Sequence, residues 1–296
     1  MEEPESSDFD VMPDKMKSHY DIIQSKASSL VSALSQASCV KGILCFGSYA
    51  MGTFDADSDI DLNVYCHPDI MPSTDRRAVI SGIPGVADME MDRTDGGGDA
   101  SWSPCGDRLR LNGVLVDIGY NTVEWMSTVV RRVPTEGATS IPELVFRPYT
   151  ILGLLENSVI LYETDAYLSD LVQKIHPYPS TLRANLLSQS LPTLAAAAAE
   201  MRDYVKRDIG NSAFHFHFQN AIHALGTALF AINERYDPAT KRVEQAYATL
   251  DRLPDAFLQR YADMLETPLT KKGRRVIAEE LRLLSEEMNQ LAQSGV

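Results

Sequence analysis

Apolar residues recur along this chain with two different periods, and the period changes near residue 147. Residues 14–34 carry an apolar side chain at every third or fourth position, which places these side chains on one face of an α-helix. A short apolar run follows at residues 42–46, and residues 60–65 alternate apolar with polar positions, the period of a β-strand. The pattern therefore predicts a helix followed by two strands.

A hairpin is indicated further along, where two apolar runs at residues 109–111 and 114–118 are separated by Asn112-Gly113. An Asn-Gly pair between such runs is a strong signal for a tight two-residue turn. Residues 92–106, just before the hairpin, are so rich in Gly, Asp and Ser that we expect no regular structure there.

Long helix-forming stretches replace the strand-like runs beyond residue 147, and they cover residues 180–208, 212–236, 242–265 and 271–293. The order of the elements predicts an α+β protein, in which a small mixed sheet with flanking helices precedes a C-terminal helical bundle. We expect two domains, a sheet domain at residues 1–147 and a helical domain at residues 148–296.

Composition narrows the class of protein without naming a function. The 296 residues are 44% hydrophobic and 23% charged, as in ordinary globular proteins. Asp and Glu outnumber Lys and Arg by 41 to 27, and a net charge of −14 disfavours a nucleic acid duplex as partner. Because no apolar stretch is long enough to cross a membrane and no secretion signal begins the chain, we expect a cytoplasmic protein without a membrane partner.

Candidate chemistry lies between Gly47 and Leu62. Residues two apart on a strand share a face, so Asp59 and Asp61 project their carboxylates in one direction and suit a hard divalent cation. Gly47 and Ser48 lie at the turn after the first strand, where backbone N–H groups and a hydroxyl can receive phosphate oxygens.

Other interpretations of this segment were weighed by spacing. A P-loop would need a lysine after Gly52, where Thr53 stands, and an EF-hand starting at Asp55 would need glycine at Ile60. Asp55 and Asp57 are best interpreted as turn residues. Asp59 and Asp61 could be the solvated face of an edge strand, but two like charges side by side are unfavourable without a cation.

The segment Gly47-Ser48, Gly52 and Ser58-Asp59-Ile60-Asp61-Leu62 resembles the signature of the DNA polymerase beta-like nucleotidyltransferase superfamily. Within it, a sheet domain followed by helices is similar to antibiotic nucleotidyltransferases of the kanamycin and streptomycin type and to uncharacterised bacterial relatives. The resemblance is close for residues 40 to about 125. It implies the nucleotidyltransferase fold, with a nucleotide-binding catalytic domain at 1–147 and an acceptor-binding helical domain at 148–296.

The resemblance also implies a third carboxylate on a later strand, and Asp117, in an otherwise apolar run, is the candidate. Asp59, Asp61 and Asp117 are then the catalytic and metal-binding residues for one or two Mg²⁺ ions, and Gly47 and Ser48 bind the nucleotide. Asp117 is either a general base or a metal ligand alone, and Glu124 is a weaker substitute. Lys206 is a further nucleotide-binding candidate, although an exposed lysine on a helix is more often a solvated residue.

The expected reaction is the Mg²⁺-dependent transfer of a nucleoside monophosphate, AMP from ATP, to a hydroxyl. The acceptor is a small molecule, such as an aminoglycoside-like antibiotic, or a protein side chain. Two alternatives stay open: a non-catalytic nucleotide-binding module that regulates or binds a partner, and a phosphohydrolase that uses the same acids. Neither the acceptor, the nucleobase preference nor the oligomeric state follows from the sequence.

Overall fold

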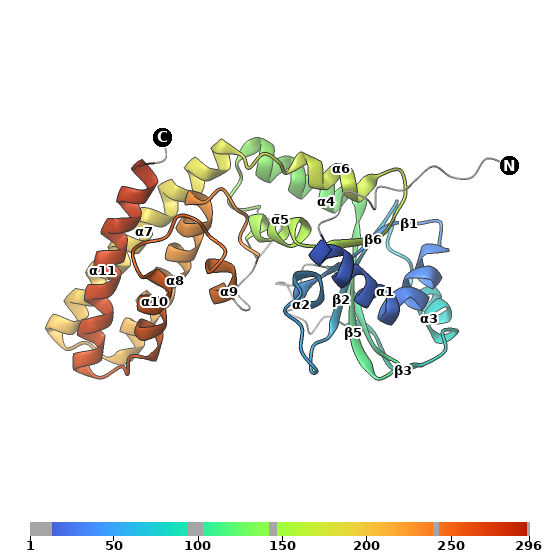
Figure 1. The fold of residues 1–296 in the computed structure, drawn as a ribbon, viewed down its shortest axis with the longest axis horizontal. Helices are drawn as coiled ribbons and strands as arrows, with labels where there is room; N and C mark the ends of the chain where they lie inside the picture. The colour runs from blue at the N-terminus through green and yellow to red at the C-terminus, as the bar shows by residue number, and fades with distance from the viewer. Residues whose placement is uncertain (1–13, 94–102, 142–146, 239–242, 295–296) are drawn as a thin grey trace. The chain divides into compact units, whose positions relative to one another are not determined.

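The computed structural model describes residues 14–93, 103–141, 147–238 and 243–294 (Figure 1). The chain divides into two compact units. The first runs through Val130 and takes up Leu154–Ile175, while the second comprises Arg131–Ile141, Arg147–Gly153 and the chain from His176 onward.

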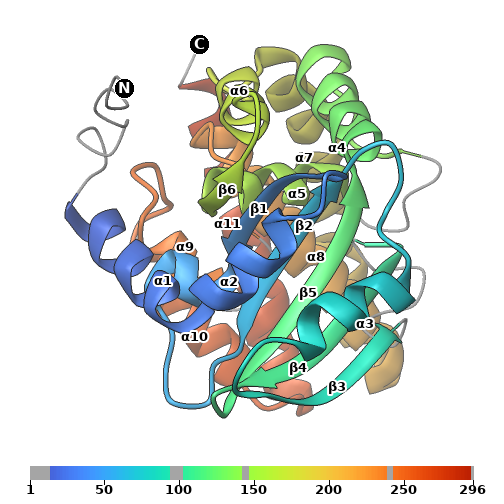
Figure 2. The ribbon, with the colours of Figure 1, turned by 90° about the vertical axis from the view of Figure 1, so that its right-hand side faces the viewer.

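A mixed sheet forms the centre of the first unit. Among the described residues it has six strands, in the order β3-β4-β5-β2-β1-β6. Neighbouring strands are antiparallel except β2 and β5, which run parallel and side by side (Figure 2). The strands are β1 (Val40–Phe46), β2 (Ile60–Cys66), β3 (Val86–Arg93), β4 (Cys105–Leu111), β5 (Val114–Thr122) and β6 (Val159–Glu163).

Helix α1 (Asp14–Ser35) covers one face of this sheet. Its side chains Ile23, Ala27 and Leu30 are fully buried, and they share one hydrophobic core with Ile43 of β1 and Leu62 of β2. Because alternate residues of a strand point to opposite faces, the residues between these apolar positions face away from α1. Four further helices belong to this unit: α2 (Gly47–Met51), α3 (Ser73–Ser81), α4 (Val123–Val130) and α6 (Tyr167–Lys174). Helix α5 (Pro148–Glu156) has its first residues in the second unit and its last residues in the first.

The predicted hairpin is confirmed. Leu111 of β4 pairs with Val114 of β5, and both turn residues, Asn112 and Gly113, have positive φ angles of 51° and 86°. Positive φ at both central positions is what a type I′ turn requires, and it explains why this pair occurs here.

The second unit is helical. Its long helices α7 (Ser180–Arg207), α8 (Asn211–Ile232) and α11 (Lys271–Gln293) pack on one another around a core that includes Leu194, Met201, Phe214, Leu229 and Leu281. Three short elements complete it: the π-helical turn η3 (Arg131–Thr135), α9 (Val243–Tyr247) and α10 (Phe257–Glu266). The fold class expected from the sequence, a sheet with flanking helices followed by a helical region, is confirmed.

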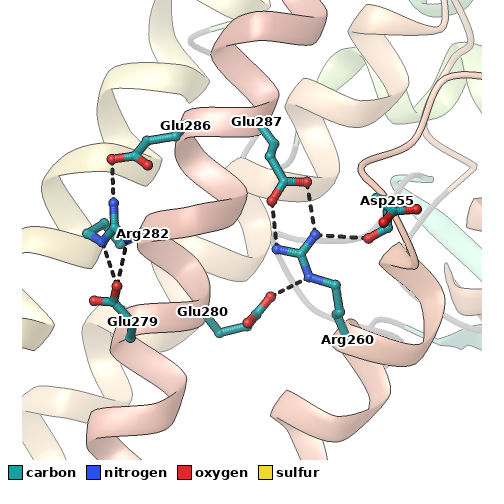
Figure 3. A network of polar contacts seen from close by, with 7 residues as sticks. All are labelled: Asp255, Arg260, Glu279, Glu280, Arg282, Glu286 and Glu287. Carbon is teal, nitrogen blue, oxygen red and sulfur yellow. Dashed lines mark hydrogen bonds and ion pairs between the residues drawn. The ribbon is translucent and has the colours of Figure 1, made fainter.

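Arg260 joins α10 to α11. Its guanidinium donates to Glu280 at 2.7 Å and to both carboxylate oxygens of Glu287 at 2.8 and 2.9 Å, while the Asp255 carbonyl accepts a further bond (Figure 3). Arg282, by contrast, bonds to Glu279 and Glu286 of its own helix. The first set of contacts links two elements, and the second stays within one.

Three expectations about the elements need correction. The single helix expected at 242–265 is wrong, because α9 ends at Tyr247 and α10 begins at Phe257, after Pro254 and the left-handed Ala256. Strand β6 lies beyond residue 147, where the pattern predicted helices alone, and it pairs with β1. The stretch 92–106 contains the end of β3 and the start of β4, and its residues 94–102 lie outside the described part.

None of the described helices combines the length and the apolar character that crossing a lipid bilayer requires.

Candidate functional site

Strand β2 delivers Asp61 to the sheet face opposite α1. Ile60, Leu62 and Val64 are fully buried in the core, and the alternation of the strand turns Asp61 and Asn63 to the other face. Asp59 lies one residue before the strand, and it is half-buried, as Asp61 is. The alternation predicted for 60–65 is confirmed.

Strand β5 brings Asp117 to the same place, because Asp117 is the direct neighbour of Asp61 in the parallel pairing of β5 with β2. One carboxylate oxygen from each of Asp59, Asp61 and Asp117 lies within 4.8 Å of the others. Such a cluster of oxygen atoms is a donor set that a hard divalent cation prefers. The three acids singled out from the sequence therefore lie together.

Arg108 faces this cluster from β4. It pairs in register with Asp117, and its Nε and Nη2 donate to the two carboxylate oxygens at 2.6 and 2.7 Å. A bidentate pair of this kind fixes the plane of the carboxylate. Three carboxylates and one guanidinium leave two negative charges, which one divalent cation would balance, so the residues present fit a metal of that charge.

Gly47 closes the cluster from the end of β1. Its φ is +71°, and a Cβ built at this position would overlap Oδ2 of Asp61. No other residue type combines this backbone conformation with so little volume. Glycine is therefore required at position 47 so that the Asp61 carboxylate can occupy its place in the cluster.

Ser48 is the second residue of α2, immediately after Gly47. Its carbonyl accepts from Thr53 N–H at 2.9 Å, whereas its hydroxyl has no hydrogen-bond partner among the residues that the structure describes. The preceding residue at the start of the helix, Phe46, makes no side-chain cap either. The Ser48 hydroxyl is therefore a candidate hydrogen-bond donor to a ligand at this turn.

The loop between α2 and β2 is held by its own polar residues, as expected for Asp55 and Asp57. The Asp55 carboxylate accepts from Asp57 N–H at 3.1 Å and from the Ser58 hydroxyl at 2.9 Å. Asp55 N–H in turn donates to Ser58 Oγ at 2.9 Å. These bonds make a turn that leads into Asp59, and they leave Asp55 and Asp57 outside the cluster.

Burial and negative charge near the cluster raise the pKa values of two neighbouring side chains. Cys45, on the core face of β1, has its thiol pKa raised well above its usual value by burial and, to a smaller degree, by the negative charge of Asp61. Tyr49 of α2 also has a raised pKa, chiefly through burial, with Asp59 among the smaller causes. Both groups stay neutral beside the carboxylates near neutral pH.

Polar residues behind the acids were missed from the sequence. The fully buried Asn121 donates to Asn63 Oδ1 at 3.1 Å and to Ser103 Oγ at 2.9 Å. Gly119 lies between them, and a Cβ there would overlap Ser103 Oγ. Arg108 was missed as well, although a two-residue turn at 112–113 places position 108 opposite 117 by counting back along the hairpin.

The other candidates lie elsewhere. Glu124 is exposed in α4 and pairs with His67 at 2.6 Å. Lys206 is exposed in the last turn of α7, in the second unit, and its role toward a nucleotide stays a prediction.

A known protein family and a solved structure are similar to this chain. Residues 26–81 match the model of the family described as "Nucleotidyltransferase domain". No curated protein is significantly similar in sequence. Among solved structures, the chain is similar to a nucleotidyltransferase-like protein from Exiguobacterium sibiricum 255-15, at 14% identity and a TM-score of 0.43, over 92% of this chain and 75% of that one. The domain match is limited to residues 26–81, and the structural similarity is too low to support an assignment.

Proposed function

We propose, from the premise that this chain carries a nucleotidyltransferase domain of the DNA polymerase beta-like superfamily, that it transfers AMP from ATP to a hydroxyl. The acceptor in this proposal is a small molecule, with an aminoglycoside-like antibiotic as one example, or a protein side chain. The observation that carries the proposal is the convergence of Asp59, Asp61 and Asp117 within 4.8 Å. The helical domain, residues 148–296, would bind the acceptor.

In this proposal Asp59, Asp61 and Asp117 hold one or two Mg²⁺ ions. When bound, such ions neutralise phosphate charge and favour departure of pyrophosphate. The absence of a side chain at Gly47 leaves space for the Asp61 carboxylate, and the Ser48 hydroxyl would donate to a phosphate oxygen. Lys206 is retained as a nucleotide-binding candidate in the second unit.

Asp117 would orient the attacking hydroxyl, and Arg108 would hold Asp117 in the plane that this requires. The two hydrogen bonds from Arg108 occupy one lone pair on each carboxylate oxygen, so each oxygen keeps capacity for a further contact. Asp117 can therefore keep its pair with Arg108 while it acts on a ligand.

A metal-ligand substitution tests the proposal. Asp61→Asn or Asp59→Asn should abolish pyrophosphate release from ATP and Mg²⁺ in the presence of a panel of hydroxyl acceptors, because each change removes a metal ligand. The melting temperature without metal should hold or rise, since like-charge repulsion is relieved. Asp57→Asn, in the adjacent turn, is the matched control and should keep its turnover. Pyrophosphate release near that of the unchanged chain in either variant would exclude the metal assignment.

One observation favours a second candidate, a non-catalytic nucleotide-binding protein that regulates or binds a partner. Asp117 already has a cationic partner in Arg108, so its charge is compensated without a metal. Labelled ATP separates the candidates: label on an acceptor supports transfer, and bound ATP without turnover supports the regulatory protein. Hydrolysis to AMP that needs no acceptor would indicate a phosphohydrolase.

A further inference from the structure

The second unit, which is helical, contains a polar cavity of about 310 Å³. It is lined from α7 by Gln189, Ser190 and Thr193, from α8 by Asn220 and His223, and by Arg147 just before α5. A volume of this size lies at the lower end of those found for small-molecule sites. All the lining residues belong to the second unit.

Arg147 supplies the charge of this cavity. Its Nη1 makes a long contact of 3.4 Å to Thr227 Oγ1, and within the described residues no carboxylate lies at ion-pair distance from its guanidinium. A half-buried cation that has no carboxylate partner in the described part of the chain favours an anion. None of the described residues that line this cavity is acidic.

The hydroxyl groups of the cavity add a second requirement. Ser190 donates its proton to the Leu186 carbonyl at 2.7 Å, Thr193 to the Gln189 carbonyl at 2.7 Å, and Thr227 to the His223 carbonyl at 2.9 Å. Their protons are committed to the helix backbone, so their oxygens can act only as acceptors toward a ligand. A ligand that satisfies them must itself carry O–H or N–H donors.

A neighbouring hollow of about 250 Å³ shows which side of Arg147 an anion prefers. It shares Arg147 and His223 with the first cavity, but its lining adds the carboxylates of Asp237 and Glu244. Those charges repel an anion, and the first cavity has none of them. His223 adds no second positive charge near neutral pH, because burial and the charge of Arg147 lower its pKa.

We propose that the cavity around Arg147 binds a small polyhydroxylated anion, of about the size of a hexose, that carries a single carboxylate or phosphate group. Arg147 binds the anionic group, and the oxygens of Ser190 and Thr193 accept from the ligand hydroxyls. The Asn220 amide, on α8, provides both a donor and an acceptor. The residues that line this site belong to the second unit, whereas the aspartates of the proposed nucleotidyl transfer belong to the first.

Calorimetric titration of the full chain tests this inference with four probes: D-gluconate, D-glucose 6-phosphate, sorbitol and inorganic phosphate. At least one of the two hydroxylated anions should bind, and the better one identifies a carboxylate or a phosphate as the preferred group. Sorbitol lacks the charge and inorganic phosphate lacks the hydroxyl chain, so both should bind at least tenfold more weakly. No heat from either hydroxylated anion at millimolar concentration would overturn the proposal.

Variants locate the binding. Arg147→Gln should weaken the better probe at least tenfold, and Arg275→Gln, at an exposed arginine of α11, should leave it unchanged. If circular dichroism shows that Arg147→Gln fails to fold, Asn220→Leu replaces it as the test, and this variant should lower the affinity for the better probe at least threefold. Binding that survives the substitution used would refute the site. Asp59→Asn should keep full affinity, so failure of the proposed enzymatic function and failure of this site are distinguishable.

Discussion

At the scale of single residues, Gly47 controls how Asp61 is placed. We predict that Gly47→Ala destabilises the chain by more than the ~1–2 kcal/mol that a non-glycine residue costs in the left-handed region, because the added methyl also overlaps the Asp61 carboxylate. Chemical denaturation measures the loss of stability, and pyrophosphate release measures the loss of activity.

Gly113→Ala is the matched control for that change. Gly113 has a φ of +86°, but a Cβ there would meet nothing within 4 Å, so this substitution carries the backbone cost without the overlap. It should be the milder of the two and should keep activity. Equal losses of stability and activity in the two variants would show that the proximity of Gly47 to Asp61 has no consequence.

Ser48 offers a milder test of the same site. Ser48→Ala should raise the KM for ATP severalfold and leave kcat within a few-fold, because one neutral hydrogen bond contributes about 0.5–1.5 kcal/mol. Steady-state kinetics with ATP varied at saturating acceptor measures both constants. An unchanged KM would remove Ser48 from the nucleotide site, and a change in stability alone would give it a structural role.

The acids of the site could be predicted from the sequence, and their polar neighbours could not. Asp59 and Asp61 follow from the two-residue period of a strand, and Asp117 stands out because it interrupts an apolar run. Asn63 and Asn121 look like ordinary strand residues, since their significance arises from the pairing of β2 with β5. Arg108 lay at the edge of a stretch interpreted as irregular, which hid its place opposite Asp117.

At the scale of elements, Arg260 shows how an ion pair stabilises by joining two helices. We predict that Arg260→Ala lowers the free energy of unfolding of the helical unit by about 1–3 kcal/mol, because Glu280 and Glu287 lose a partly buried partner. Arg282→Ala, whose partners lie on the same exposed helix face, should have a much smaller effect. Thermal unfolding followed by circular dichroism compares them, and equal shifts in Tm would contradict the interpretation.

Element prediction succeeded where a local signal was strong and failed where tertiary structure decided. Helix α11 was expected at 271–293 and spans those residues, since its heptad-like pattern is regular and Thr270 caps its start. The stretch 242–265 has a similar composition, yet the chain turns at Pro254 and Ala256. Strand β6 has five residues, too few for a period to show, and its pairing with β1 comes from the sheet.

At the scale of the whole molecule, buried thiol and phenol groups that stay protonated in the folded chain make its stability fall at alkaline pH. Burial raises the pKa of the Cys66 thiol to about 11 from an unfolded value of 9.0, and burial raises the pKa values of Cys45 and Tyr65 as well. The folded chain therefore holds these protons more tightly. The contribution of the Cys66 proton is complete below pH 9 and is lost as the pH rises to about 11. The contribution of Cys45 continues to fall above that pH, and the contribution of Tyr65, whose ordinary pKa is 10.0, begins to fall only above pH 10.

We accordingly predict that the free energy of unfolding falls between pH 9 and pH 11, by up to about 1.4 kcal/mol per pH unit for each such proton. Urea denaturation at a series of pH values measures the slope. Cys66→Ala removes one of these groups, so its stability should fall less steeply over the same interval than that of the unchanged chain. Parallel slopes would show that the Cys66 thiol does not contribute.

The place of β6 at the edge of the sheet has a consequence for synthesis on the ribosome. Strand β1 is translated early and can pair with β2 along one edge. Its other edge stays unpaired until β6 is translated, after β5 and α5. Until then the nascent chain presents an open strand edge, which can pair with a second unfinished chain. Chains that stall or are cut before residue 159 should therefore self-associate, and a chaperone that shields the β1 edge would help most during that interval.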